Sequence, residues 1–482
     1  MKIGIDIGSY SIKTARLTPE GIATIVPDAQ TRLAYTLTSF RPTEGGFLVG
    51  ADASTLSHHP TDILEYLNKT TPVLTDHQKK SWYAAGIVAL YIKKIRLDTD
   101  VLHIEGAVSC VPSSWDSVQK KGMETAVQLA DIPLLRCVDA PIAAAWHHRP
   151  SAQKPVLIID WGHSGLRLSL VQKTSDTFQS IASIEKQGIG GKHWNDLITE
   201  WLLQQFKVRF DHLANSHITQ AIASCAGALK ENLSDALFAK QTILAESELL
   251  GIMLDRQSFE RLISADMPQF SNLLNQLLRQ VSLSAEGLDE VILTGGCTLV
   301  PYVKQKIKAH LTNVKKWYDK DALLANALGS VRYAVQFIPG HTLPETDHLN
   351  LGVLNINSKT QNTEIDTIVA RTSALPARTR RTYYTATQDQ REINLTIVQF
   401  GEDKSDYDVL DKVLIGPLLS SEAHQAIEVT FVYDEEGILR ITGYDPETGT
   451  EYQNTLQITA SEGFQFYPQR RLVRSTPVNG VI

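Results

Sequence analysis

Residues 2–11 read KIGIDIGSYS, and residues 156–165 read VLIIDWGHSG. In each stretch an apolar run typical of a strand ends at an aspartate, and a glycine follows two residues later. Glycine lets a backbone approach a phosphate closely, and the N–H groups of such a turn can bind it. One turn of this kind is explained equally well as an ordinary hairpin. Two of them, some 150 residues apart, predict duplicated lobes that close on phosphates from opposite sides.

A third glycine turn follows a later apolar strand. Residues 290–298 read EVILTGGCT, so Gly295 and Gly296 stand directly after the strand. A glycine pair at this place lets a base or a ribose lie against the backbone. Three glycine turns in this order across an α/β chain make a strong combined signal for a nucleotide site.

The periodicity of apolar residues divides the chain into two parts. Over residues 1–338 strand-like and helix-like patterns alternate, which is typical of an α/β architecture. Prolines and acidic residues over 339–349 predict an interdomain linker. Over 350–463 the period falls to two, as in INLTI (393–397), which predicts an antiparallel β module. The basic residues 464–482 are expected to form a flexible tail rather than a docked segment.

Composition bounds the class of protein. A chain of 482 residues exceeds one ordinary core, and a formal net charge of −7 argues against nucleic-acid binding. The start does not read as a signal peptide, and no run reaches the ~18 apolar residues of a membrane span. We therefore expect a cytoplasmic protein without membrane partners. The four cysteines are scattered without metal-ligand spacing, and we expect buried free thiols.

Further runs make a family resemblance specific. GGKHWN (190–195), CAGALKENLS (225–234) and DAPIAAA (139–145) resemble elements of the DnaK-type seventy-kilodalton heat-shock chaperones, within the actin-like ATPase superfamily. In the β module, IEVTF (427–431) and EGIL (436–439) resemble the peptide-binding domain of the same family. The resemblance implies a two-lobed, ribonuclease-H-like, actin-like α/β ATPase domain followed by an antiparallel β-sandwich. The family's helical lid is expected to be lacking.

The resemblance also implies a nucleotide site for ATP or ADP with magnesium. Asp6 and Asp160 would hold the magnesium through water, Asp160 would also be catalytic, and Lys69 is the nearest candidate for the family's catalytic lysine. The nucleotide-binding residues implied are Asp6, Gly8, Ser9, Tyr10, Asp160, Gly162, His163, Gly190, Gly191, Lys230, Ser234, Gly295 and Gly296.

For the β module the resemblance implies a groove that binds extended apolar peptides. Its lining would be Val353, Ile356, Tyr383, Ala386, Ile393 and Leu395. The alternative is that these residues are the inward faces of the sandwich, since alternation alone predicts buried residues.

Three positions depart from the family pattern where catalysis needs them. Ala140 stands in place of a glutamate, and Gly165 and Arg167 stand in place of a threonine and an aspartate. Phosphoryl transfer depends on positioned water and on groups that stabilise charge, so we expect at most a slow ATPase. Arg167 either holds a phosphate as a fixed cation or points outward and touches nothing.

Two functions remain open. The first is a chaperone-like protein that binds adenine nucleotide and extended apolar polypeptide segments, with a J-domain protein as a candidate partner. The second is a pseudo-ATPase scaffold that binds one dedicated protein.

Overall fold

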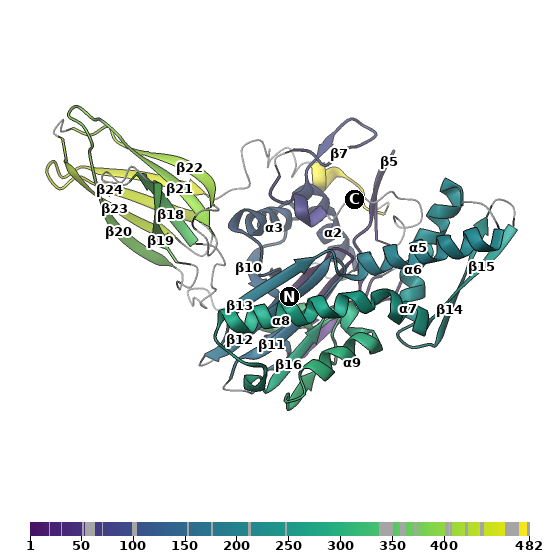
Figure 1. Cartoon of the computed structure of the whole chain (residues 1–482). Coiled ribbons are helices and arrows are strands. Elements are labelled where there is room, and N and C mark those ends of the chain that lie inside the picture. Colours follow the sequence, from purple (N-terminus) through teal and green to yellow (C-terminus); the bar gives the residue numbers. More distant parts are fainter. Residues whose placement is uncertain are drawn as a thin grey trace. The chain divides into compact units, whose positions relative to one another are not determined.

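A computed structural model gives the fold (Figure 1). It describes the chain except residues 19, 30, 51–52, 54–62, 70, 99–103, 152–153, 175–176, 211–213, 246–247, 337–349, 357–362, 371–372, 374–375, 401–403, 405–406, 420–422, 434–437, 458–471 and 480–482. The predicted linker therefore lies outside the described residues. Two compact units result: residues 1–39, 98–110 and 138–335 form the first, and residues 40–97, 111–137 and 336–482 form the second.

The first sheet is built around β1 (Lys2–Ile7), which ends at the first glycine turn. It pairs antiparallel with β2 (Ser11–Leu17) and parallel with β9 (Gly106–Val111). The order is β10-β9-β1-β2-β3, with β10 at Leu134–Asp139 and β3 at Ala23–Val26, and β4 (Thr36–Leu37) also pairs with β2. Ile3 and Ile5 of β1 are fully buried, so the apolar run forms a central strand.

The second sheet repeats this arrangement. Its central strand β11 (Val156–Trp161) ends at the second glycine turn and pairs antiparallel with β12 (Gly165–Thr174) and parallel with β16 (Glu290–Thr294). The order β17-β16-β11-β12-β13 matches that of the first sheet, with β13 at Thr177–Gln187 and β17 at Lys316–Tyr318. The sequence prediction of a duplicated α/β arrangement with two equivalent turns is confirmed at the level of topology.

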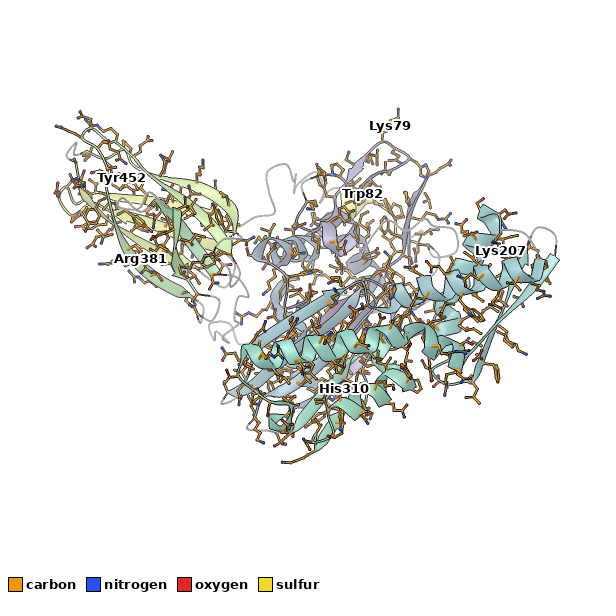
Figure 2. The ribbon with its side chains drawn as sticks, viewed as in Figure 1. Lys79, Trp82, Lys207, His310, Arg381 and Tyr452 are labelled. Atoms are coloured by element: carbon orange, nitrogen blue, oxygen red, sulfur yellow. The ribbon has the colours of Figure 1, made fainter. Side chains whose placement is uncertain are left out.

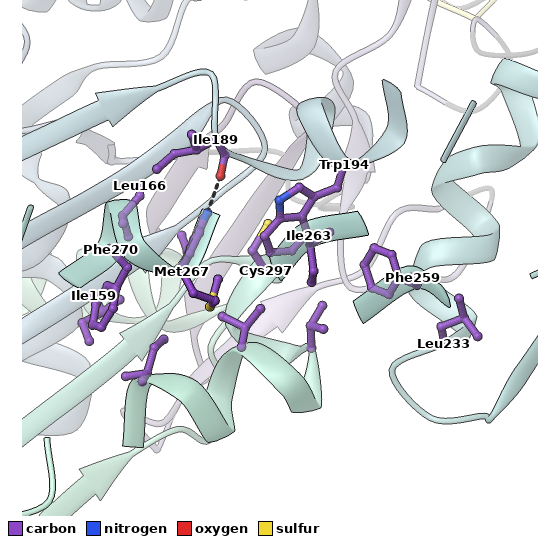
Figure 3. Close-up of a cluster of buried hydrophobic side chains, with 14 of the residues drawn as sticks. Ile159, Leu166, Ile189, Trp194, Leu233, Phe259, Ile263, Met267, Phe270 and Cys297 are labelled. Atoms are coloured by element: carbon purple, nitrogen blue, oxygen red, sulfur yellow. Dashed lines mark hydrogen bonds between the residues drawn. The ribbon is translucent and has the colours of Figure 1, made fainter. Parts of the chain in front are cut away.

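Helices pack on the second sheet and bury its side chains. Helix α4 (Ala140–His148) and helix α8 (Met267–Gln280) contact β12 and β13. The core between sheet and helices contains Trp161, Trp194 and Phe270, and the indole N–H of Trp161 donates to the carbonyl of Ile189, the dashed bond in Figure 3. All four cysteines are free and buried, as predicted.

The first unit also contains further helices and a hairpin outside the strands of the two sheets, and the last of these helices packs on β2 and β3 of the first sheet. They are α5 (Gly191–Phe210), α6 (Ser216–Asn232), the hairpin β14 (Phe238–Ala245) and β15 (Glu248–Asp255), α7 (Arg256–Ile263), α9 (Pro301–His310) and α10 (Ala325–Gln336). Among the described residues, no helix is long and apolar enough to cross a membrane.

The second unit contains a small lobe and a β-sandwich. Elements of the lobe are β5 (Phe40–Thr43), β6 (Gly46–Val49), β7 (Leu74–Thr75), β8 (Ser81–Trp82), α2 (Ala84–Asp98) and α3 (Ser117–Leu129). Trp82, labelled in Figure 2, is fully buried there.

The sandwich consists of two four-stranded antiparallel sheets, β19-β18-β21-β22 and β20-β23-β24-β25. Their strands are β18 (Asn350–Ile356), β19 (Thr363–Val369), β20 (Ala377–Tyr384), β21 (Ile393–Phe400), β22 (Tyr407–Ile415), β23 (Ala426–Tyr433), β24 (Ile438–Tyr444) and β25 (Glu451–Gln457). One apolar core takes side chains from both sheets. Arg381 of β20, labelled in Figure 2, donates to Asp366 of β19 at 2.8 Å and so links the sheets.

The described part of the C-terminal tail, residues 472–479, is docked on the small lobe. Phe47 N–H donates to Pro477 O at 2.9 Å. The side-chain amide of Asn479 accepts a hydrogen bond from Val49 N–H and donates one to Val49 O. The ammonium of Lys93 donates to three tail carbonyls, and Val478 is fully buried. These residues do not form the flexible tail that was expected, because pairing and burial fix them on the lobe.

Candidate functional site

The two glycine turns have the same local geometry. Gly8 N–H donates to Ser11 O at 3.1 Å, and Gly162 N–H donates to Gly165 O at 2.9 Å, so each turn closes a tight hairpin. Within the described residues, the amides at the two tips, of residues 9 and 10 and of residues 163 and 164, donate no hydrogen bond. Consecutive amides left open at a turn form a concave donor site for an anion. Each repeat therefore presents one such site.

The two tips lie next to each other. The ring of Tyr10 is 5.0 Å from the ring of His163, measured between centroids, with an interplanar angle of 32°. The Tyr10 hydroxyl also donates to Glu231 Oε1 on α6 at 3.0 Å. Tyr10 thus joins the first repeat to two elements of the second, which brings the open amides of both tips to the same region.

The Gly190–Gly191 turn packs directly on the second tip. A Cβ added at Gly190 would lie 2.4 Å from the carbonyl oxygen of His163, so no larger residue fits without movement. The ammonium of Lys230 donates to Gly191 O at 2.8 Å. These predicted residues are therefore brought together around the second tip.

The third glycine turn packs on the end of β11. Gly295 has a φ of 83°, which favours glycine, and an added Cβ would lie 2.4 Å from Trp161 O and 2.8 Å from Asp160 Oδ1. The thiol of Cys297 donates to Gly162 O at 3.2 Å. The three turns that the sequence singles out thus converge.

Ser234, which follows α6, uses its carbonyl to accept a hydrogen bond from Arg256.

Each loop aspartate has a cation opposite it in the adjacent strand. Asp6 pairs in register with Lys13 of β2, and Lys13 Nζ lies 3.5 Å from Asp6 Oδ2. Asp160 pairs in register with Arg167 of β12, and Arg167 Nη1 lies 3.9 Å from Asp160 Oδ2. Residues directly opposite in an antiparallel pair have their side chains on the same face, so the two ion pairs are equivalent positions of the two repeats.

Arg167 has a second partner. Its Nε donates to Glu185 of β13 at 2.9 Å, and Glu185 stands opposite Arg167 in register. The alternative that Arg167 points outward and touches nothing is wrong. In the first repeat, pairing of β2 with β3 begins at Thr14, so Lys13 has no residue of β3 opposite it.

Burial shifts the protonation of several groups in this region. Burial, reinforced by Lys230 and Lys192, lowers the pKa of His163 to about 4, so its ring is neutral at physiological pH. Burial lowers the pKa of Lys230 as well. The pKa of Asp160 is raised by burial, although Arg167 opposes this. Burial and the nearby Glu231 raise the pKa of Tyr10, which keeps its hydroxyl a donor.

The side chains present fit magnesium poorly. In a nucleotide site magnesium keeps several waters and is held by one or two carboxylates and the phosphates, so Asp6 and Asp160 are the side chains that would have to serve it. Asp6 and Asp160 each already have a cation close to one carboxylate oxygen, and Ala140 offers no carboxylate. In the part of the chain that the structure describes, no group of three or more His, Cys, Asp or Glu residues could hold a metal ion.

The replaced catalytic positions are fixed by packing. Ala140 is buried in the first turn of α4. A Cβ on Gly165 would lie 2.3 Å from Lys186 O, so the backbone of β13 excludes a threonine there. Lys69 belongs to the second compact unit, in the turn after the short helix at Ile63–Tyr66.

The residues predicted to line a peptide groove are divided between core and surface. Val353, Ile393 and Leu395 belong to the core between the sheets, with at most 6% exposure. Tyr383 is half-buried against that core, Ala386 is exposed, and the side chain of Ile356 lies outside the described residues. The buried three match the alternative that they are inward faces, and peptide binding stays a prediction.

The molecule thus combines a duplicated α/β unit, with two facing hairpin tips, and an antiparallel β-sandwich. The sequence model of the family "Hsp70 protein" matches residues 36–476, and the chain belongs to this family. The chain is 27% identical over 374 residues to "Chaperone protein HscA homolog" of Shewanella amazonensis, covering 75% of this chain and 58% of that protein. It is 25% identical over 476 residues to "Chaperone protein DnaK" of Thermosipho melanesiensis, covering 93% of this chain and 79% of that protein.

Sequence reasoning missed Lys13, Glu185 and the bond from Tyr10 to Glu231. A signal for the cations was present, because Lys13 and Arg167 each stand seven residues after the loop aspartate. In a hairpin closed by a short turn, that spacing places the two side chains opposite each other. The contact with Glu231 has no such local signal, since it joins residues 221 positions apart.

Proposed function

We propose that the α/β part is an actin-like ATPase domain that binds an adenine nucleotide, ATP or ADP, and hydrolyses it slowly or not at all. The observation that carries this is the meeting of two hairpin tips, each with open amides, at the contact between Tyr10 and His163. Two anion sites side by side suit the consecutive phosphates of a nucleotide. Membership of the Hsp70 family and the relatives named DnaK and HscA support the same function.

Slow or absent hydrolysis follows from what stands at the catalytic positions. Ala140 has no group that can position water, and Gly165 cannot be exchanged for a residue with a hydroxyl without moving β13. Loss of one positioned donor typically costs about 10²–10³ in rate, and two positions are altered in addition to Arg167. Binding without fast turnover is the expected outcome.

The β-sandwich is proposed to hold extended apolar polypeptide segments, with the protein acting as a chaperone in the cytoplasm. Main-chain hydrogen bonds and an apolar pocket would bind such a segment. A J-domain protein is a candidate partner. The second candidate function is a pseudo-ATPase scaffold for one dedicated protein, which the burial of Val353, Ile393 and Leu395 favours, because core side chains do not contact a peptide.

Isothermal titration with ATP and with ADP, each with and without magnesium, tests the nucleotide proposal. We expect saturable heat at micromolar protein, and a single-turnover assay is expected to show little phosphate release over many minutes. Absence of heat in every condition would remove nucleotide binding from the function.

A fluorescent-peptide binding assay tests whether the β-sandwich binds extended polypeptide segments. Ala386→Arg alters an exposed predicted groove residue, and Thr382→Arg on β20 is a matched exposed control. Weaker binding only in Ala386→Arg supports the groove, whereas equal affinity in both variants removes it. Capture of one stoichiometric protein, with no binding of denatured polypeptides, would select the scaffold.

A further inference from the structure

Both repeats place a basic residue at the same position relative to their loop aspartate. Lys13 stands opposite Asp6 and Arg167 stands opposite Asp160, and each pair is the second residue pair from the turn in its hairpin. All four side chains are mostly buried, with exposures of 12%, 13%, 20% and 19% respectively. A lone surface cation is often accidental, but the same placement in two repeats points to a common role for the pair.

The ammonium of Lys13 lies against the first hairpin. Its Nζ donates to Ser11 O at 3.3 Å, and a Cβ added at Gly8 would be 3.7 Å from it. The cation therefore lies against the hairpin whose tip carries the open amides of residues 9 and 10. The distance of 3.5 Å to Asp6 is long for a charged hydrogen bond, so the flexible lysine can turn toward an incoming phosphate without losing a short contact.

Basic side chains of the chain itself already stand beside both loop aspartates. Asp6 and Asp160 contribute −2, Lys13 and Arg167 contribute +2, and Arg167 also pairs with Glu185. A divalent cation placed at these aspartates would be repelled by the two neighbouring basic groups. Magnesium and the two basic side chains therefore compete for the same carboxylates.

We propose that this site binds the phosphates of its nucleotide without a divalent cation, with Lys13 and Arg167 supplying the positive charge that magnesium would otherwise supply. This inference rests on the proposed nucleotide binding and adds its metal independence. Lys13 is the contacting cation, because it has one carboxylate neighbour in register. Arg167 is held between Asp160 and Glu185 and acts mainly by neutralising Asp160. Both tips supply backbone N–H donors to the phosphate oxygens.

The test is titration of ADP into the full chain in excess EDTA and again in excess magnesium. The proposal predicts dissociation constants that agree within about threefold. Binding that needs magnesium would overturn metal independence and leave nucleotide binding intact. Absence of binding in both conditions would overturn nucleotide binding and this inference with it.

Variants of Lys13 test whether its ammonium supplies the positive charge that binds the phosphates. Lys13→Met is expected to weaken ADP binding in EDTA by about tenfold or more, and magnesium is expected to restore part of the loss, since Asp6 is then unpaired. Lys173→Met, an exposed lysine on β12, is the matched control and is expected to bind like the parent chain. Lys13→Arg, which keeps the charge, serves if the methionine variant does not fold. Equal affinity of Lys13→Met and Lys173→Met in EDTA would overturn the role of Lys13.

Discussion

The hairpin β1–β2 and the hairpin β11–β12 share one local structure. Both end a central strand at an aspartate, both close with the same glycine N–H bond, and both place a cation opposite that aspartate. They differ in what surrounds the cation. Arg167 is fixed by Glu185 on a third strand, whereas β3 starts pairing one residue too late to reach Lys13.

The difference separates two tasks that one basic residue could perform. A guanidinium held by two carboxylates stabilises the fold and has little freedom to move. An ammonium with one carboxylate at 3.5 Å is available to a ligand. We therefore expect Arg167 of the second repeat to contribute mainly to the stability of the fold, and Lys13 of the first repeat mainly to nucleotide affinity. The following variants test this division.

We expect the largest effect at Gly295, because its turn packs on the aspartate of the second repeat. In Gly295→Ala the new Cβ would meet Trp161 O and Asp160 Oδ1 at a positive φ. We expect a loss of about 2–4 kcal/mol of stability, seen as a melting temperature lower by several degrees. Gly162→Ala is the control, since its Cβ would have no neighbour nearer than 4.0 Å, and a loss within about 1 kcal/mol is expected. Equal melting temperatures of the two variants would contradict the packing described.

Arg167→Met tests the stabilising role of the second cation. It leaves Asp160 and Glu185 without their shared partner, and we expect a loss of about 1–3 kcal/mol in a denaturant titration. The folded pKa of Asp160, already raised by burial, then rises further because Arg167 lowers it. The loss of stability should therefore be largest near pH 8. It should shrink toward acid pH, where Asp160 is protonated in both the parent protein and the variant.

Lys13→Met is the counterpart in the first repeat and should cost less stability than Arg167→Met. A larger loss of stability in Lys13→Met than in Arg167→Met would reverse the proposed division of roles.

Titration of His163 tests how closely the two tips pack. Burial holds its folded pKa at about 4, below the ordinary value of 6.5. The unfolded chain then binds the proton more tightly, so this residue removes stability as the pH falls from about 6.5 toward 4. The ring signals of His163 in a nuclear magnetic resonance titration should move with a midpoint near 4. A midpoint near 6.5 would show that the ring is open to solvent.

Tyr10→Phe gives the smallest expected effect, because it removes a single hydrogen bond and its partner Glu231 is exposed. We expect a loss of about 0.5–1.5 kcal/mol at neutral pH. Glu231→Gln keeps an acceptor for the hydroxyl and should lose less, both measured by thermal unfolding. A greater loss in Glu231→Gln than in Tyr10→Phe would indicate that Glu231 acts through another contact.

Local patterns were sufficient to predict the α/β part, the antiparallel β module and the three turns, whereas the actin-like class was implied by the family resemblance. Aspartate, glycine and apolar runs lie within ten residues of each other, and the period-two pattern marks strands of the sandwich wherever they pair. The groove residues show the limit of such patterns, because alternation identifies an inward face but not whether a second sheet covers it. Val353, Ile393 and Leu395 are covered.

Features that depend on distant residues could not be predicted in this way. The docked tail joins Val478 to Phe47 and Asn479 to Val49, over 400 positions apart, and its basic composition suggested solvent exposure. Lys13 could have been found from the spacing of seven residues shared with Arg167, but only after the hairpin register was assumed.

The central claim is that the two hairpin tips form one phosphate site served by the cations of the chain. A crystal structure of the chain grown with ADP in EDTA tests it most directly. The account predicts phosphate oxygens at the amides of residues 9, 10, 163 and 164, with the ammonium of Lys13 in contact with a phosphate oxygen. A nucleotide bound elsewhere, or ordered at these tips only when magnesium is present, would contradict it.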